Sequence, residues 1–238
     1  MKSGWLATQI NRTEVFANKL SLFSERGSGE VPINGNKLGD WSYEYFWQEA
    51  IKHYWFDLKL LDESFFIFQE NTPKRGDFRF AFYECPYHPK LSFDDYCKSS
   101  DDDSSELVEY LEAEYELLAI QKKETVTPIR YEYCEKDFTP SLHPVSHIHF
   151  GSNSEVRVGS FHVLTPVAFF LFVIRQCYPK TWDFHVVKND GMLGEARAAF
   201  SEMEFLKEEF LGEQLHLDFY LKNGPTIGST RPREARRR

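Results

Sequence analysis

The middle of the chain consists of short runs in which large apolar side chains alternate with polar ones. Residues 77–84 (DFRFAFYE) place a phenylalanine at every second position, which is the spacing of a half-buried strand. Two further apolar and aromatic runs, 53–61 and 64–70, flank a short polar turn and predict a β-hairpin. The period of two therefore predicts a β-sheet at the centre of the fold.

Helical periodicity occurs on both sides of these strands, and no regular βαβ alternation is present. The chain of 238 residues fits one large domain. We therefore predict a single-domain α+β fold, with a mostly antiparallel β-sheet flanked by helices and an N-terminal helical segment. The expected helices are 6–24, 41–53, 105–121, 166–178 and 195–210, and the further expected strands are 129–133, 146–150, 155–158 and 214–221.

The predicted organisation has three parts. Residues 1–40 form an N-terminal helix and a glycine-rich loop, and residues 41–222 form the α+β domain. An acidic insertion covers about 92–121. Residues 223–238 hold an arginine-rich end and are predicted to be a disordered basic tail.

The formal charge is concentrated in one segment. Residues 94–116 hold ten acidic residues and one lysine, which equals the whole net charge of −9. An acidic chain does not coat nucleic acid by bulk charge. The segment is either a solvated loop and helix face or a surface that binds a basic protein partner.

The expected compartment is the cytoplasm. The first residues contain no apolar signal region, and the most apolar run, 163–174, is too short for a bilayer, so no membrane association is predicted. The four cysteines form no CxxC pair and no zinc-finger spacing. Free thiols in a reducing compartment are expected.

Several landmarks together resemble a known bacterial family. The apolar hairpin is followed by FYECPYHP, PIRYEY, HPVSHIHFG and LTPVAFFLFVIRQCYP. This order resembles domain of unknown function 2290 over about residues 41–185, most specifically over 128–179. The resemblance implies a cytosolic protein from mobile or defence-related gene neighbourhoods, and it implies no reaction. RYEY followed by HPxxHxH is also similar to small toxins of bacterial toxin–antitoxin pairs, which implies a ribonuclease-like site at the histidines.

Three of the eight histidines lie within seven residues: His143, His147 and His149. On a strand over 146–150, His147 and His149 point to one face with Cα atoms about 6.6 Å apart, and Ile148 points to the other. This spacing suits two imidazoles that flank a phosphate or share a metal ion. Arg157 is expected on the neighbouring strand.

Three interpretations of the cluster stay open: a structural or partner-binding role, metal-independent phosphodiester chemistry, and a metal site. In the second, one imidazole accepts a proton, the other donates one, and an arginine holds the phosphate. No cofactor is required, although zinc on three histidines is geometrically feasible. The candidate catalytic residues are His147, His149, His143, Arg157 and Tyr131, the candidate binding residues are Arg130, Tyr133 and Ser146, and the metal set would be His143, His147 and His149.

Two functions follow from these patterns. The first is a toxin- or defence-type protein that acts on RNA or DNA phosphodiesters through the histidine cluster. The second is a non-catalytic interaction subunit that uses the acidic segment 94–116 or an aromatic face of the sheet. The orientation of the histidines, into a cleft with Arg157 or into backbone contacts, separates the two.

Overall fold

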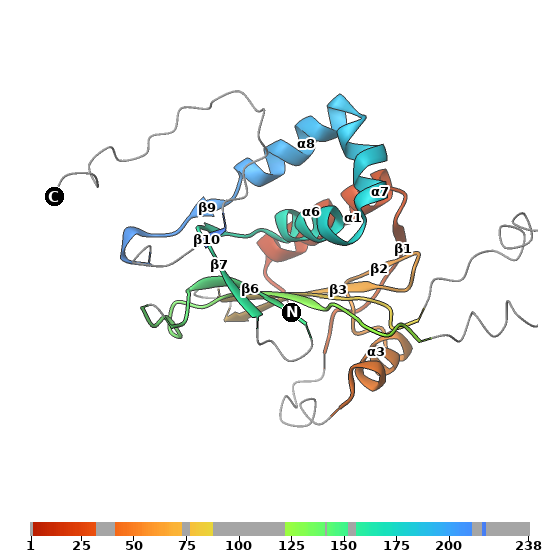
Figure 1. Cartoon of the computed structure of the whole chain (residues 1–238), viewed down its shortest axis with the longest axis horizontal. Helices are drawn as coiled ribbons and strands as arrows, with labels where there is room; N and C mark the ends of the chain where they lie inside the picture. The colour runs from red at the N-terminus through yellow and green to blue at the C-terminus, as the bar shows by residue number, and fades with distance from the viewer. Residues whose placement is uncertain are drawn as a thin grey trace, which may run out of the picture.

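One large sheet of eight strands organises the part of the chain that the computed structural model describes (Figure 1). The strand order is β1-β2-β3-β4-β5-β6-β7-β10, and every neighbouring pair is antiparallel except β7 and β10. The predicted α+β fold is confirmed. The described residues are 2–31, 41–72, 77–87, 122–140, 142–151, 156–210 and 216–217. The strands are β1 (Phe23–Arg26), β2 (Leu58–Leu60), β3 (Phe65–Thr72), β4 (Asp77–Tyr83), β5 (Ile129–Tyr133), β6 (Ser146–Phe150), β7 (Val156–Ser160) and β10 (His216–Leu217).

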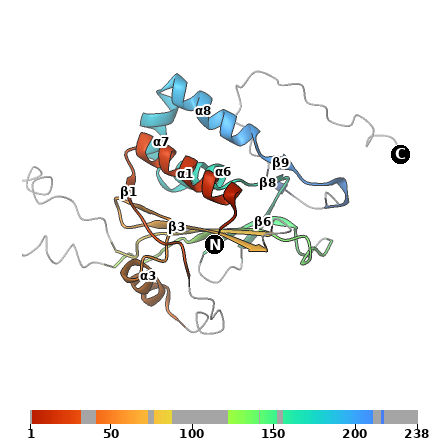
Figure 2. The same ribbon diagram turned by 180° about the vertical axis from the view of Figure 1, so that it is seen from behind.

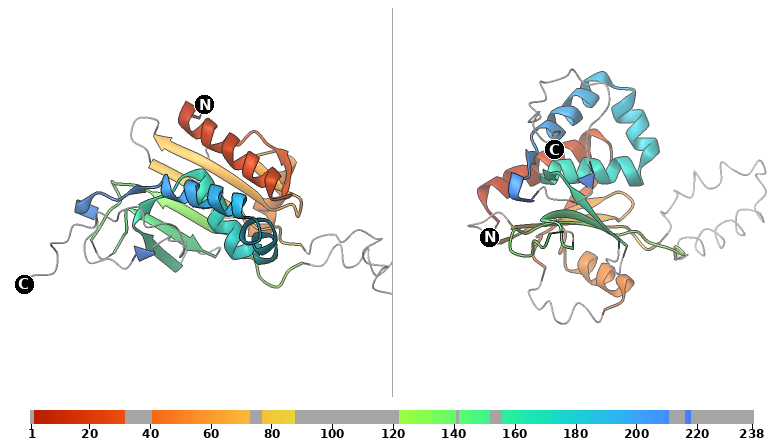
Figure 3. Two further views of the ribbon diagram at one scale, coloured as in Figure 1. Left: turned by 90° about the horizontal axis from the view of Figure 1, so that it is seen from above. Right: turned by 60° about the vertical axis from the view of Figure 1, so that its left-hand side comes forward.

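Helices cover both faces of this sheet, but more of them lie on one face than on the other. Figures 1 and 2 show α1, α6 and α8 on one side and α3 alone on the other, and Figure 3 shows α1 and α6 side by side over the sheet. A small second sheet pairs β8 (His162–Val163) with β9 (Glu204–Phe205). The helical elements are α1 (Gly4–Lys19), α3 (Tyr43–Lys52), α6 (Pro166–Cys177), α7 (Pro179–Trp182), the π-helical turn η1 (Asp183–Val187), α8 (Asp190–Ser201) and the 3₁₀ turn η2 (Glu208–Phe210).

Helix α6 is the centre of the main core. The Thr165 side chain caps its first turn by accepting a hydrogen bond from the Ala168 amide at 3.1 Å, and Pro166 starts the helix without losing a bond. Its first nine residues are all buried, and α6 packs on the sheet beside α1 and against α8. The predicted helix start at Thr165-Pro166 is confirmed. Among the described residues, no helix is both long enough and apolar enough to cross a membrane.

The two faces of the sheet differ in chemistry. On β4, Phe80 and Phe82 join the core beneath α6, as the alternation in the sequence predicts. The opposite face has an apolar half, where α3 packs through Trp47 and Ala50 on Phe65 and its neighbours. Its other half, on strands β4 to β7, carries arginine, glutamate and histidine side chains. This polar half holds the candidate site.

The prediction of one helix over 6–24 is wrong in its last turn. Helix α1 ends at Lys19, and Ser21 has a φ of 55°, which stops the helical path. Phe23 then begins β1, which pairs with β2 at the edge of the sheet. Tertiary pairing with the hairpin therefore replaces the last helical turn.

The prediction of a helix over 195–210 is wrong in its second half. Helix α8 begins earlier, at Asp190, because the Asn189 side chain caps it, and it ends at Ser201. The chain then forms β9 beside β8. Of the predicted strand 214–221, the described part is β10, and the predicted acidic helix 105–121 lies outside the described residues.

Candidate functional site

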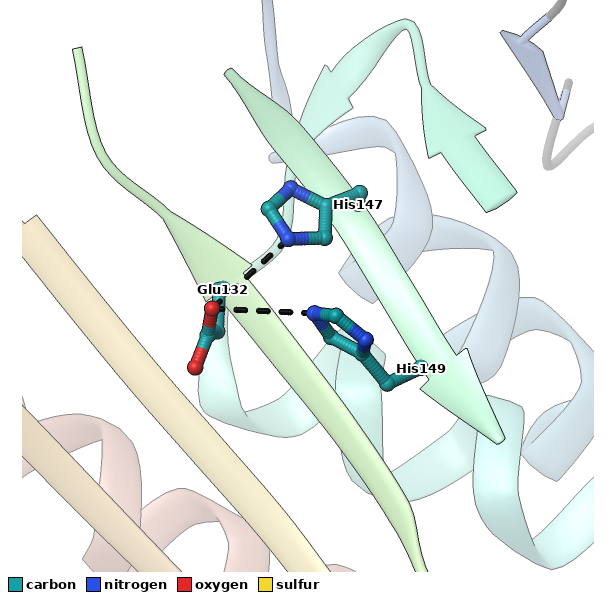
Figure 4. A group of neighbouring side chains, drawn as sticks. All are labelled: Glu132, His147 and His149. Carbon is teal, nitrogen blue, oxygen red and sulfur yellow. Dashed lines mark ion pairs between the residues drawn. The ribbon is translucent and has the colours of Figure 1, made fainter. Parts of the chain in front are cut away.

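The candidate site is a cluster of Glu132, His147 and His149 on the polar half of the sheet (Figure 4). Glu132 lies opposite His147 in the β5–β6 register. His147 and His149 are two positions apart on β6, so both side chains leave the sheet on the same side. Two neighbouring strands therefore deliver one carboxylate and two imidazoles to one point.

The distances within this cluster are unusual for a simple ion pair. The Nε2 atoms of His147 and His149 each lie 3.6 Å from the same oxygen, Oε2 of Glu132. One ligand atom from each of the three residues lies within 4.8 Å of the others. A charge-assisted hydrogen bond is shorter, at about 2.7–2.9 Å. Two ligand atoms on a tetrahedral zinc ion, each about 2.1 Å from the metal, are roughly 3.4 Å apart, which is close to the observed separation.

The tautomer of His147 strengthens this comparison. Its Nδ1 atom lies 2.8 Å from the Pro144 carbonyl oxygen, which accepts hydrogen bonds and cannot donate them, so Nδ1 carries a proton. In a neutral imidazole, Nε2 then presents its lone pair to the Glu132 carboxylate. Two electron-rich atoms face each other stably only with a cation between them, either a proton or a metal ion. A backbone carbonyl on the other ring nitrogen is also the usual support of a metal-binding histidine.

Two arginines hold the carboxylate in place. Arg79 Nη2 and Arg130 Nε lie 2.9 and 3.0 Å from Oε1 of Glu132, the oxygen that does not face the histidines. Burial by itself raises the pKa of Glu132, but the two histidines and the charges of Arg130 and Arg79 outweigh it and lower the pKa far below the usual range. Glu132 is therefore ionised, with one oxygen ion-paired to the arginines and the other directed at both imidazoles.

His143 and Arg157 border the cluster. The His143 ring lies 4.8 Å from the His147 ring, centroid to centroid, and its Nδ1 is buried without a hydrogen-bond partner among the described residues. Burial, Arg157 and His147 lower the pKa of His143 below its ordinary value of 6.5. Arg157 is exposed and lies opposite His149 in the β6–β7 register. The structure thus brings five predicted site residues to this face: His143, His147, His149, Arg157 and Arg130.

Three other predicted site residues lie on the opposite face, and grouping them with the histidines needs correction. Tyr131, Tyr133 and Ser146 belong to the main core, because residues on β5 and β6 alternate between the two faces. The Tyr131 hydroxyl accepts a hydrogen bond from the Leu164 amide at 2.9 Å and donates one to Ser146 Oγ at 3.0 Å. Ser146 Oγ in turn donates to the His162 carbonyl. These side chains link β5 and β6 to the segment before α6.

We expect Tyr131→Phe to lower the free energy of unfolding by about 1–3 kcal/mol, because the buried Leu164 amide loses its acceptor. Urea denaturation at constant protein concentration measures the change. Tyr54→Phe is the matched control, since Tyr54 is about half exposed, and its effect should stay within about 0.5 kcal/mol. Equal stability of the two variants would show that the Tyr131 hydroxyl does not support the fold.

The sequence interpretation missed Glu132 and Arg79. The metal set considered there was three histidines, whereas Glu132 replaces His143 in the group that the structure brings within 4.8 Å. The signal was present in the alternation: a strand that buries Tyr131 turns Arg130 and Glu132 to the other face. The same rule places Arg79 on this face, because Phe78 and Phe80 face the core, and the β4–β5 register sets it opposite Glu132.

Fold and site together define an α+β protein whose sheet carries a carboxylate–imidazole–guanidinium cluster opposite its main helical layer. The profile of a family described as "Uncharacterized conserved protein (DUF2290)" matches residues 19–217. The chain therefore belongs to the DUF2290 family, and the resemblance found over residues 41–185 is confirmed. No curated protein and no solved structure matches the chain.

Proposed function

We propose that the chain is a metal-dependent phosphodiesterase whose metal ligands are Glu132, His147 and His149. The observation that carries this proposal is the convergence of two imidazole nitrogens on one carboxylate oxygen, each at 3.6 Å. Two histidines and a glutamate are a donor set of catalytic zinc, with the fourth position open to water or substrate. Zinc is the metal we propose.

Burial favours a metal site over direct proton transfer by the two histidines. The His147 and His149 side chains are 0% and 3% exposed, so neither imidazole has a free surface for a substrate. A general acid or base must reach within hydrogen-bond distance of the proton that it transfers. A metal ion bound on the outer side of the cluster would contact a substrate while its two histidine ligands stay buried. In this form of the proposal, His143 and Arg157 are the groups nearest the reacting atoms.

The surrounding charge favours an anionic substrate. Arg79, Arg130 and Arg157 lie on the same face, and Glu132 is the acidic member of the described cluster. Guanidinium groups match phosphate oxygens in geometry and stabilise the charge that develops during phosphoryl chemistry. A bound divalent metal lowers the pKa of its water and polarises a phosphoryl oxygen. RNA or DNA is the proposed substrate, and a toxin- or defence-type role in the cytoplasm is the proposed context.

The test is hydrolysis of labelled single-stranded RNA and DNA, and of bis(p-nitrophenyl) phosphate, by the full chain with and without Zn²⁺. We expect chelation to remove the activity and Zn²⁺ to restore it. Glu132→Gln should lower the rate at least about 100-fold, because the amide is a poor ligand and cannot balance the metal charge.

The matched control is His53→Gln, which removes an exposed histidine paired with Glu49 and should leave the rate unchanged. Activity that survives both chelation and Glu132→Gln would overturn the metal mechanism. Stoichiometric zinc without turnover on any of the three substrates would overturn the proposed reaction and support the alternative function. That alternative is a non-catalytic subunit that binds a basic protein through residues 94–116, and the charge of −9 in this segment supports it.

A further inference from the structure

We propose that a small cavity beside the histidine cluster binds a phosphate group of the substrate. The cavity has a volume of about 110 Å³ and lies where the apolar half of the face, under α3, meets the polar half. Its polar lining consists of Arg79, Arg130, Gln69 and Tyr83, and its apolar lining includes Phe46 and Ile67. As a statement about substrate, the inference rests on the proposed function, but the anion site itself is testable without any metal.

The two arginines have hydrogen-bonding capacity left for a ligand. A guanidinium carries five N–H donors, whereas Arg79 and Arg130 each make one ion pair with Oε1 of Glu132 and no further hydrogen bond or ion pair within the described part of the chain. Two positive charges meet one negative charge here. Both arginines line the cavity, where an anion would balance the surplus positive charge and accept hydrogen bonds from the unused donors.

The other lining groups define the ligand more closely. Gln69 offers an amide beside Arg79, its partner in the β3–β4 register. Burial raises the pKa of Tyr83, and the charges of Arg130 and Arg79 oppose that rise, so the hydroxyl lies within the electrostatic reach of both guanidiniums. The Phe46 ring packs against Tyr83 in a tilted arrangement, with ring centroids 4.8 Å apart. Cationic donors against an aromatic wall suit a phosphate attached to a planar or apolar group.

Glu132 connects this cavity to the metal ligands. Its Oε1 contacts the two arginines of the cavity, and its Oε2 faces the two histidines. An anion in the cavity and a metal on the histidines are therefore separated by a single carboxylate. This placement suits a substrate with neighbouring phosphates, such as a nucleic-acid strand, in which one phosphate is held in the cavity and the next is attacked near the metal.

The experiment is a titration of the chelator-treated full chain with inorganic phosphate, in which calorimetry or ³¹P NMR detects binding. Wild type should bind phosphate at one site, and Arg79→Gln and Arg130→Gln should each weaken binding by about tenfold or more. Arg12→Gln is the matched control. Arg12 lies on α1, on the other side of the sheet, where it pairs with Glu202, and its loss should leave phosphate affinity unchanged.

A second variant keeps both arginines and reduces the volume of the cavity. Ala81 lines the cavity, so Ala81→Leu should also weaken phosphate binding, with thermal unfolding monitored to confirm folding. Wild-type phosphate affinity in a folded Ala81→Leu or Arg79→Gln variant would overturn the inference, as would the absence of phosphate binding by wild type. Phosphate binding without any zinc binding would instead refute the proposed metal centre and leave the anion site standing.

Discussion

Replacing both His147 and His149 by glutamine is expected to lower the affinity of the chain for Zn²⁺ by at least about 100-fold. These two imidazoles supply two of the three ligands, and a glutamine side chain is a much weaker ligand than a neutral imidazole. Competition with a chromophoric zinc chelator measures the affinity of each protein under identical conditions. Glutamine retains a polar side chain of moderate volume, so the substitution tests ligation with little change in packing.

His53→Gln is the control for loss of a histidine as such, because His53 lies at the exposed end of α3. A thermal melt of the double variant separates lost ligation from lost folding. A folded double variant with wild-type zinc affinity would show that zinc binds elsewhere. A third outcome combines three observations: wild type binds no zinc, the double variant fails to fold, and His53→Gln folds normally. This outcome would show that the histidines are structural and would contradict the metal proposal.

Phe169→Ala is expected to lower the free energy of unfolding by about 3–5 kcal/mol. Phe169 is fully buried in α6, and its ring lies 6.0 Å from Phe80, 6.2 Å from Phe66 and 6.5 Å from Tyr131, centroid to centroid. Alanine would leave a cavity between the helix and three neighbouring strands. Urea denaturation measures the loss.

Phe184→Ala is the matched control, because Phe184 is 67% exposed and its removal should cost less than about 0.5 kcal/mol. Folded Phe169→Ala should bind zinc like wild type, since the histidine cluster lies on the other face of the sheet. Equal stability of the two phenylalanine variants would show that α6 is not the centre of the core.

Local patterns predicted most of the sheet and its principal helix. The alternation around Phe80 requires a half-buried strand, and Thr165-Pro166 combines a side-chain cap with a residue that suits the first helical turn. Elements whose ends depend on distant partners were harder to predict. The segment after Lys19 has helical spacing, but pairing of β1 with β2 turns it into a strand.

Only part of the candidate site was predictable, because some of its contacts also depend on distant partners. That His147 and His149 share a face follows from strand geometry alone. The carboxylate between them depends on the β5–β6 register, and the connection between these strands is too long for a turn type to set that register. Alternation within β5 nevertheless separates Glu132 from Tyr131, so the inclusion of Tyr131 in the site was avoidable from the sequence.

The most direct measurement is the zinc content and zinc coordination of the wild-type chain after loading with Zn²⁺ and exhaustive dialysis. We expect one zinc ion per chain, and X-ray absorption should show nitrogen and oxygen ligands at about 2.0–2.2 Å. Glu132→Gln, treated in parallel, should retain far less zinc. Absence of bound zinc in wild type, or zinc held by sulfur at about 2.3 Å, would contradict a metal centre at Glu132, His147 and His149.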